Sequence, residues 1–66
     1  MHYLQQNIIK ILATRESARY SEIKPKTIES NHFLYPLNLL IKDGLVGIRA
    51  NKSYDLANKG RAYIDN

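Results

Sequence analysis

Apolar residues recur at helical spacing near the start of the chain. They are separated by four, three and one positions, so they fall on one face of an α-helix. The pattern predicts a first helix over about residues 3–15, with Ile9 beside the apolar face. The residues of this face are Leu4, Ile8, Ile11 and Leu12.

A second amphipathic pattern lies between residues 31 and 42. At the helical increment of about 100° per residue, its apolar and polar residues separate onto opposite faces. Gly44 is expected to end this helix, because glycine readily adopts the left-handed conformation of a helix terminus. Ser30 or Asn31 is the expected N-cap. The apolar face holds Phe33, Leu37, Leu40 and Ile41, and the polar face holds Asn31, His32, Tyr35, Asn38 and Lys42, with Leu39 at its edge.

Pro36 allows two interpretations of this second pattern. If the helix begins near Asn31, Pro36 lies just beyond the first turn, where it removes a backbone donor and crowds a carbonyl. If the helix begins near Tyr35, Pro36 lies in the first turn and is well tolerated. Both alternatives predict that the front half of the helix is bent or begins late.

Residues 18–20 connect the two patterns and can form a short edge strand. Ser21 is a good N-cap for a helix beginning at Glu22, whose negative charge suits a helix N-terminus. Pro25 follows quickly and disfavours helical geometry in the residue before it. The intervening helix is therefore predicted to be one turn long or bent at Lys24.

The last third of the chain has the pattern of a hairpin followed by a helix. Residues 45–49 and 53–56 predict two strands around a turn in which Asn51 is the natural turn former. A weak final helix is expected over residues 58–64, since Gly60 lowers helix propensity. Tyr63 and Ile64 are expected to close the core or to contact a partner. The hairpin residues expected to face the core are Leu45 or Val46, Ile48, Tyr54 and Leu56.

Length and charge narrow the class of protein. A chain of 66 residues corresponds to a single domain, 1–66. Its net charge of +4 suits a polyanionic partner such as nucleic acid, although a soluble basic protein would have the same composition. Cysteine is absent, which excludes disulfides and thiolate metal sites. Neither a signal peptide nor an apolar run of membrane-spanning length is recognisable, so we expect a cytoplasmic protein and no membrane partner.

The predicted order of helix, short strand, helix, helix and two-stranded hairpin resembles the winged helix-turn-helix. The end of the second pattern and the wing are similar to those of the MarR and ArsR groups of regulators. Pro36 and Ala57 depart from this pattern, which commonly has histidine and threonine there. The resemblance implies an α+β domain, mainly α with a small β-hairpin: three helices plus a two- or three-stranded wing sheet. The residues that carry it are Tyr35-Pro36-Leu37, Leu40, Gly44-Leu45-Val46, Tyr54, Leu56 and Gly60.

The winged-helix resemblance implies sequence-specific binding of double-stranded DNA, with the third helix in the major groove and the wing on the backbone or minor groove. Transcriptional regulation is the expected role. Asparagine can pair with adenine, and lysine can reach guanine or phosphate. The alternative is that these side chains are only the solvated face of a helix and a charged hairpin tip. The candidate DNA-binding residues are Lys24, Lys26, Thr27, Asn31, His32, Tyr35, Asn38, Lys42, Arg49, Asn51, Lys52 and Ser53.

An enzyme is not expected. His2 is placed at a fraying terminus, His32 has no identifiable carboxylate partner, and a Gly-rich phosphate loop is lacking. No cofactor, metal or small-molecule site is predicted. The alternative function is a winged-helix module that binds protein, for which Tyr3 and Leu39 would be suitable surface residues, and a homodimer fits either function. Residues 20–31 also resemble winged-helix modules that precede Nudix-type hydrolase domains, which would make the chain the N-terminal head of a larger protein.

Overall fold

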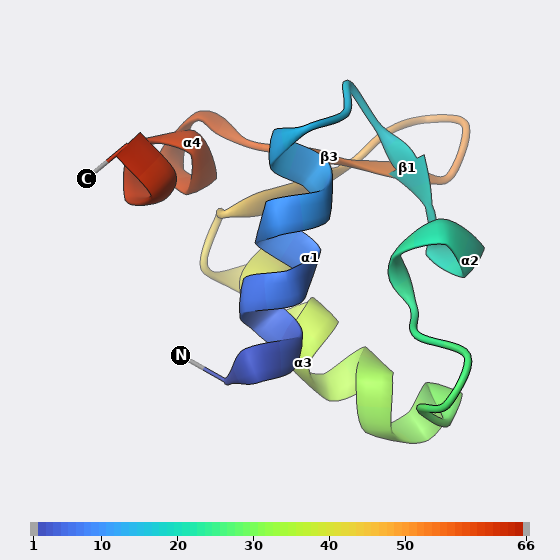
Figure 1. Ribbon diagram of the computed structural model, residues 1–66. Helices are drawn as coiled ribbons and strands as arrows, with labels where there is room; N and C mark the ends of the chain where they lie inside the picture. The colour runs from blue at the N-terminus through green and yellow to red at the C-terminus, as the bar shows by residue number, and fades with distance from the viewer. Residues whose placement is uncertain (1, 66) are drawn as a thin grey trace.

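Figure 1 shows the helices and strands of the domain in their order along the chain. The computed structural model describes residues 2–65, with side chains described for residues 2–64. Within this part, four helices and a three-stranded antiparallel sheet form a compact α+β domain. The elements are α1 (Tyr3–Ala13), β1 (Ala18–Arg19), α2 (Tyr20–Ile23), α3 (Ser30–Lys42), β2 (Val46–Ile48), β3 (Ser53–Leu56) and α4 (Asn58–Asp65).

The hydrophobic core lies between α1, α3 and the sheet. The apolar stripe predicted for the first helix is largely confirmed, although Ile9 is fully buried and Ile11 only partly so. The helix ends at Ala13, two residues earlier than predicted, and the Thr14 hydroxyl donates to the Ile11 carbonyl at 3.0 Å. The buried apolar residues are Leu4, Ile8, Ile9, Leu12, Ala18, Ile23, Phe33, Leu37, Leu40, Leu45 and Val46.

The sheet has the strand order β1-β3-β2, so the last strand of the hairpin lies in the centre. β1 is the predicted edge strand, and Ala18 pairs with Tyr54 of β3. On the other side of β3, Val46 pairs with Leu56 and Ile48 pairs with Tyr54. The sheet thus ties the segment between α1 and α2 to the hairpin.

Ile48 does not face the core as predicted. Its side chain is 58% exposed, whereas Val46 on the same strand is 2% exposed. The strand leaves the core between these residues, because Ile48 is the last residue of β2 before the hairpin tip. Alternation along the strand correctly groups Val46 with Ile48 but does not reveal where the core ends.

The helix α2 is one turn long and begins directly after β1, which corrects the predicted N-cap. Ser21 is inside the helix, and Arg19 occupies the N-cap position. The Glu22 carboxylate accepts from the Arg19 backbone N–H at 2.8 Å and so satisfies a donor at the helix start. The carboxylate at the third position of the helix therefore caps it by accepting from the N-cap backbone N–H.

The helix α3 contains Pro36 in its interior, as in the first of the two alternatives. It does not begin late: its first residue is Ser30 and its N-cap is Glu29. At the other end, Gly44 has a φ of +80°, as predicted for the terminating glycine. Backbone N–H groups of Gly44 and Leu45 donate to carbonyls of the last turn, an arrangement known as a Schellman motif.

The final helix α4 forms despite Gly60, because this glycine allows a close approach to the hairpin. A Cβ atom at residue 60 would lie 2.3 Å from the Leu45 carbonyl oxygen and 2.7 Å from a methyl carbon of Leu56. The same Leu45 carbonyl accepts from the Ala57 backbone N–H at 3.0 Å. Gly60 thus lets α4 pack directly on the backbone that precedes β2.

Candidate nucleic-acid interface

The polar face predicted for α3 is exposed in the structure. Tyr35 is 71% exposed, whereas Phe33 and Leu37 on the opposite side are fully buried. The helix has 13 residues and is therefore about 20 Å long. The packed side holds the helix on the core, which leaves its other side free to contact a partner. All five predicted residues of this face are exposed: Asn31, His32, Tyr35, Asn38 and Lys42.

The hairpin tip between β2 and β3 is a structured turn. Lys52 has a φ of +67°, and its backbone N–H donates to the Arg49 carbonyl at 2.9 Å. Asn51 acts as the predicted turn former, since its side-chain oxygen accepts from the Ser53 backbone N–H at 3.2 Å. The Ser53 hydroxyl donates to the same oxygen at 2.6 Å, and Ser53 is only 4% exposed. The ammonium of Lys52 is therefore the better placed of these groups to reach a phosphate.

Arg49 is exposed but pairs with carboxylates of its own chain. Its Nε donates to Asp55 at 2.9 Å, and its terminal nitrogen lies 3.9 Å from a carboxylate oxygen of Glu16. These pairs partly neutralise the guanidinium. A phosphate contact would have to compete with them.

The segment between α2 and α3 contributes Lys24, Lys26 and Thr27, which differ in their surroundings. The Lys24 ammonium donates to the backbone carbonyls of Ile28 at 2.8 Å and Pro25 at 3.2 Å. It thereby closes the loop that leads into α3. Lys26 and Thr27 are exposed.

A small recess lies where the start of α1 meets the middle of α3. It has a volume of about 150 Å³ and is lined by His2, His32, Tyr35 and Pro36. The two helices are also joined here by a hydrogen bond of 3.4 Å from the Gln5 side-chain amide to the Pro36 carbonyl. Two of the lining residues belong to the predicted DNA-binding set, whereas His2 and Pro36 do not.

His2 is an N-cap and not a fraying residue. Its Nδ1 accepts from the Leu4 backbone N–H at 3.1 Å, while the Gln5 side chain accepts from the His2 backbone N–H at 3.1 Å. This reciprocal arrangement is a capping box. The signal in the sequence is the spacing of His2 and Gln5, which matches a capping box except that histidine replaces serine or threonine.

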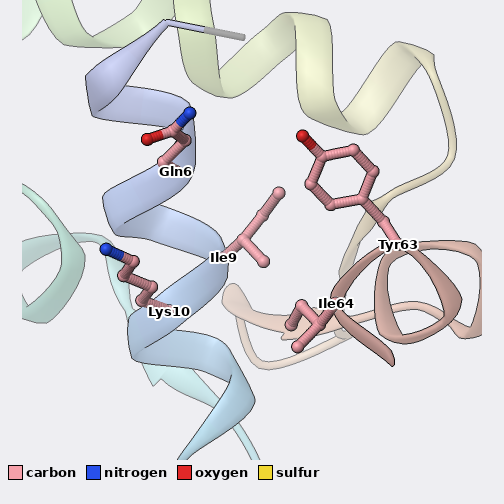
Figure 2. Close-up of a pocket in the computed structure, with 5 residues that line it drawn as sticks. All are labelled: Gln6, Ile9, Lys10, Tyr63 and Ile64. Carbon is pink, nitrogen blue, oxygen red and sulfur yellow. The ribbon is translucent and has the colours of Figure 1, made fainter. Parts of the chain in front are cut away.

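A second hollow lies between α1 and α4. It has a volume of about 270 Å³, and Ile9 lies between the two helices there (Figure 2). Tyr63 and Ile64 are 49% and 41% exposed. The expectation that they close the core is therefore wrong, and the alternative, that they contact a partner, stays a prediction. The residues that line this hollow are Gln6, Ile9, Lys10, Tyr63 and Ile64.

Among the described residues, Glu22 has a pKa that its surroundings clearly shift. The backbone N–H of Arg19 lowers the pKa of its carboxyl group below the ordinary value of 4.5, and the Arg15 guanidinium lowers it further by hydrogen bonding. This carboxylate is thus committed to the start of α2.

Residues 2–65 contain no cluster of three or more histidine, cysteine, aspartate or glutamate residues that could hold a metal ion. Across the same range, every helix is too short or too polar to cross a membrane. Comparison of the chain with family models, with curated proteins and with solved structures found no match.

Proposed function

We propose that this chain binds double-stranded DNA as a winged-helix module of a transcriptional regulator. The observation that carries the proposal is the exposed polar face of α3, set on a helix whose opposite face forms the core. The element order α1-β1-α2-α3-β2-β3 and the small antiparallel sheet are consistent with the winged-helix arrangement. The net charge of +4 favours a polyanionic partner.

The exposed side chains of α3 suit the major groove. Asn31, Asn38 and Lys42 offer amide and ammonium groups for base edges or phosphates. Seven positions separate the two asparagines, which places them about two turns apart on similar sides of the helix. The groove would thus be read along the helix axis.

Two lysines outside α3 are the proposed phosphate contacts. Lys52 lies at the hairpin tip and Lys26 in the loop before α3, and both are exposed. A basic residue at each of these two places would help to fix the orientation of the reading helix on the duplex. We expect a smaller contribution from Arg49, because Asp55 already pairs with its guanidinium.

A gel shift with random duplex at low salt is the first test. We expect a shift at micromolar protein, because nonspecific binding has a Kd of about 10⁻⁴ to 10⁻⁶ M. Selection of bound sequences from a random pool would then give the specific site. Absence of a shift at tens of micromolar protein would contradict the proposal.

The salt dependence of DNA affinity tests the two lysines. Lys26→Gln and Lys52→Asn should each reduce the slope of log K against log salt concentration by about 0.9, because each removes one phosphate contact. Asparagine is chosen at residue 52 because it tolerates a positive φ. Arg61→Gln is the matched control, since α4 lies at the opposite end of the sheet from the hairpin tip (Figure 1). A slope unchanged in the lysine variants would remove them from the interface.

A protein-binding module is the second candidate function. The hollow between α1 and α4 favours it, because Tyr63 and Ile64 expose apolar surface beside Ile9. In this alternative the chain would be an interaction module or the regulatory head of a larger protein. Failure to bind duplex DNA under the conditions above would favour this reading over the first.

A further inference from the structure

The recess between α1 and α3 is lined in part by His32 and Tyr35, two of the exposed polar residues of α3. Tyr35 belongs to both, since it lines the recess and is 71% exposed. A base edge that contacts Tyr35 would therefore lie beside the recess. Its volume of about 150 Å³ is several times the roughly 30 Å³ that one water molecule occupies in the liquid, so it can admit a methyl group.

The walls of the recess are mainly ring carbons. Pro36 is buried and contributes a saturated ring without an N–H donor, and Tyr35 contributes an aromatic ring. A methyl group that leaves water for this space would gain hydrophobic stabilisation. Among the four bases of DNA, thymine carries a methyl group at its major-groove edge.

The N-cap role of His2 makes the recess favour a hydrogen-bond acceptor. Because its Nδ1 accepts the hydrogen bond from Leu4, the neutral imidazole carries its proton on Nε2. Nε2 is therefore a hydrogen-bond donor on a ring that lines the recess. The O4 atom of thymine is an acceptor beside the methyl group, whereas cytosine presents an amino donor at that place.

We infer that the recess formed by His2, His32, Tyr35 and Pro36 takes the methyl edge of a thymine in the major groove. This inference rests on the proposed DNA binding and adds to it a base preference at one position. Tyr35 and Pro36 hold the methyl group, and His2 donates to the O4 atom. The preference for thymine over cytosine thus has an apolar and a polar component.

The test uses the full chain and a duplex obtained by selection from random sequences. Each thymine in turn is replaced by uracil, which removes the methyl group alone, and the Kd is measured. At one position we expect a loss of about four-fold, the value for burial of one methyl-sized group. Replacement of that thymine by cytosine should weaken binding by roughly 5- to 150-fold, because donors then oppose each other.

Three variants assign the effect to the recess. In Tyr35→Ala, the penalty for uracil should disappear, whereas Asn38→Ala, on the same face, should weaken binding and keep the penalty. In His2→Ser, serine retains an N-cap acceptor but lacks Nε2–H, so the penalty for cytosine should shrink while the penalty for uracil remains. Tyr35 and Asn38 are exposed, so truncation should not unfold the domain.

The failures of the two proposals are distinguishable. If the wild-type chain binds no duplex, the DNA-binding function and the thymine preference are both refuted. If it binds a selected duplex and no uracil replacement weakens binding, the thymine preference alone is refuted. A uracil penalty that persists in Tyr35→Ala would also overturn it, because the methyl group would then be read elsewhere.

Discussion

Substitution of Gly60 by alanine tests how closely α4 packs on the hairpin. In a solvent-exposed helix this change is stabilising by about 1 kcal/mol, since alanine has the higher helix propensity. Here the added Cβ would lie 2.3 Å from the Leu45 carbonyl oxygen and 3.1 Å from its carbon. Both atoms belong to the backbone, so they cannot move aside as a flexible side chain would.

The expected result is a net destabilisation of about 1–3 kcal/mol. Overpacking in a well-packed region typically costs about 1–3 kcal/mol. Displacement of the Leu45 carbonyl would also strain its hydrogen bond from the Ala57 N–H, worth about 0.5–1.5 kcal/mol. These losses exceed the gain in helix propensity. For a domain of this size, each kcal/mol corresponds to a change in Tm of about 4–8 °C.

Thermal and urea unfolding followed by circular dichroism would measure this change. Gly47→Ala is the matched control, because its Cβ would meet only side-chain atoms of Asp55, the nearest an oxygen at 2.8 Å. That carboxylate is partly exposed and can move, so the control should change stability by less than about 0.5 kcal/mol. A Gly60→Ala variant as stable as the wild type, or more stable, would refute the close approach of α4 to Leu45.

Three further substitutions test the core and the start of α2. Tyr20→Phe should raise Tm, because it removes a buried hydroxyl without a described hydrogen-bond partner. It keeps the edge-on contact with Phe33, whose ring centroid lies 5.6 Å from that of Tyr20, and a lower Tm would contradict the prediction. Glu22→Gln should make the free energy of unfolding less dependent on pH below about pH 4.5. The lowered pKa of Glu22 contributes stability that is lost as the pH falls through its pKa in the folded state, so an unchanged pH profile would refute this prediction. Leu37→Ala should cost about 2–5 kcal/mol in urea unfolding, whereas Asn38→Ala should cost less than about 0.5 kcal/mol, and similar losses would contradict the assigned faces.

Hydrophobic periodicity predicted the elements that build the core. The stripe of α1, the apolar face of α3 and the terminating Gly44 depend on local spacing and backbone geometry, and all three are found. The strand boundaries of β3 and the short strand β1 were also predicted. Such features can be predicted because residues close together in the sequence determine them.

Side-chain contacts and close packing account for what the sequence did not predict. Arg49 resembles a free phosphate contact until the fold brings Glu16 and Asp55 beside it. Ser53 resembles an exposed polar residue until the hairpin turns its hydroxyl toward Asn51. Gly60 weakens the helix pattern locally, and its packing role depends on a carbonyl fifteen residues earlier. None of these relations has a period that could be recognised along the chain.

Pro36 affects both the stability of α3 and the proposed DNA-binding recess. In a helix interior, proline is about 3 kcal/mol less favourable than alanine, partly because its missing N–H leaves the carbonyl four residues earlier without its usual donor. That carbonyl belongs to His32, which is exposed and can be hydrated. The Pro36 ring is buried, and its own carbonyl accepts from the Gln5 amide of α1. Burial and this contact offset part of the helical penalty, and the ring at the same time forms a wall of the recess. A local conflict with helix propensity at a candidate binding surface is the pattern expected where function, rather than stability, selects the residue.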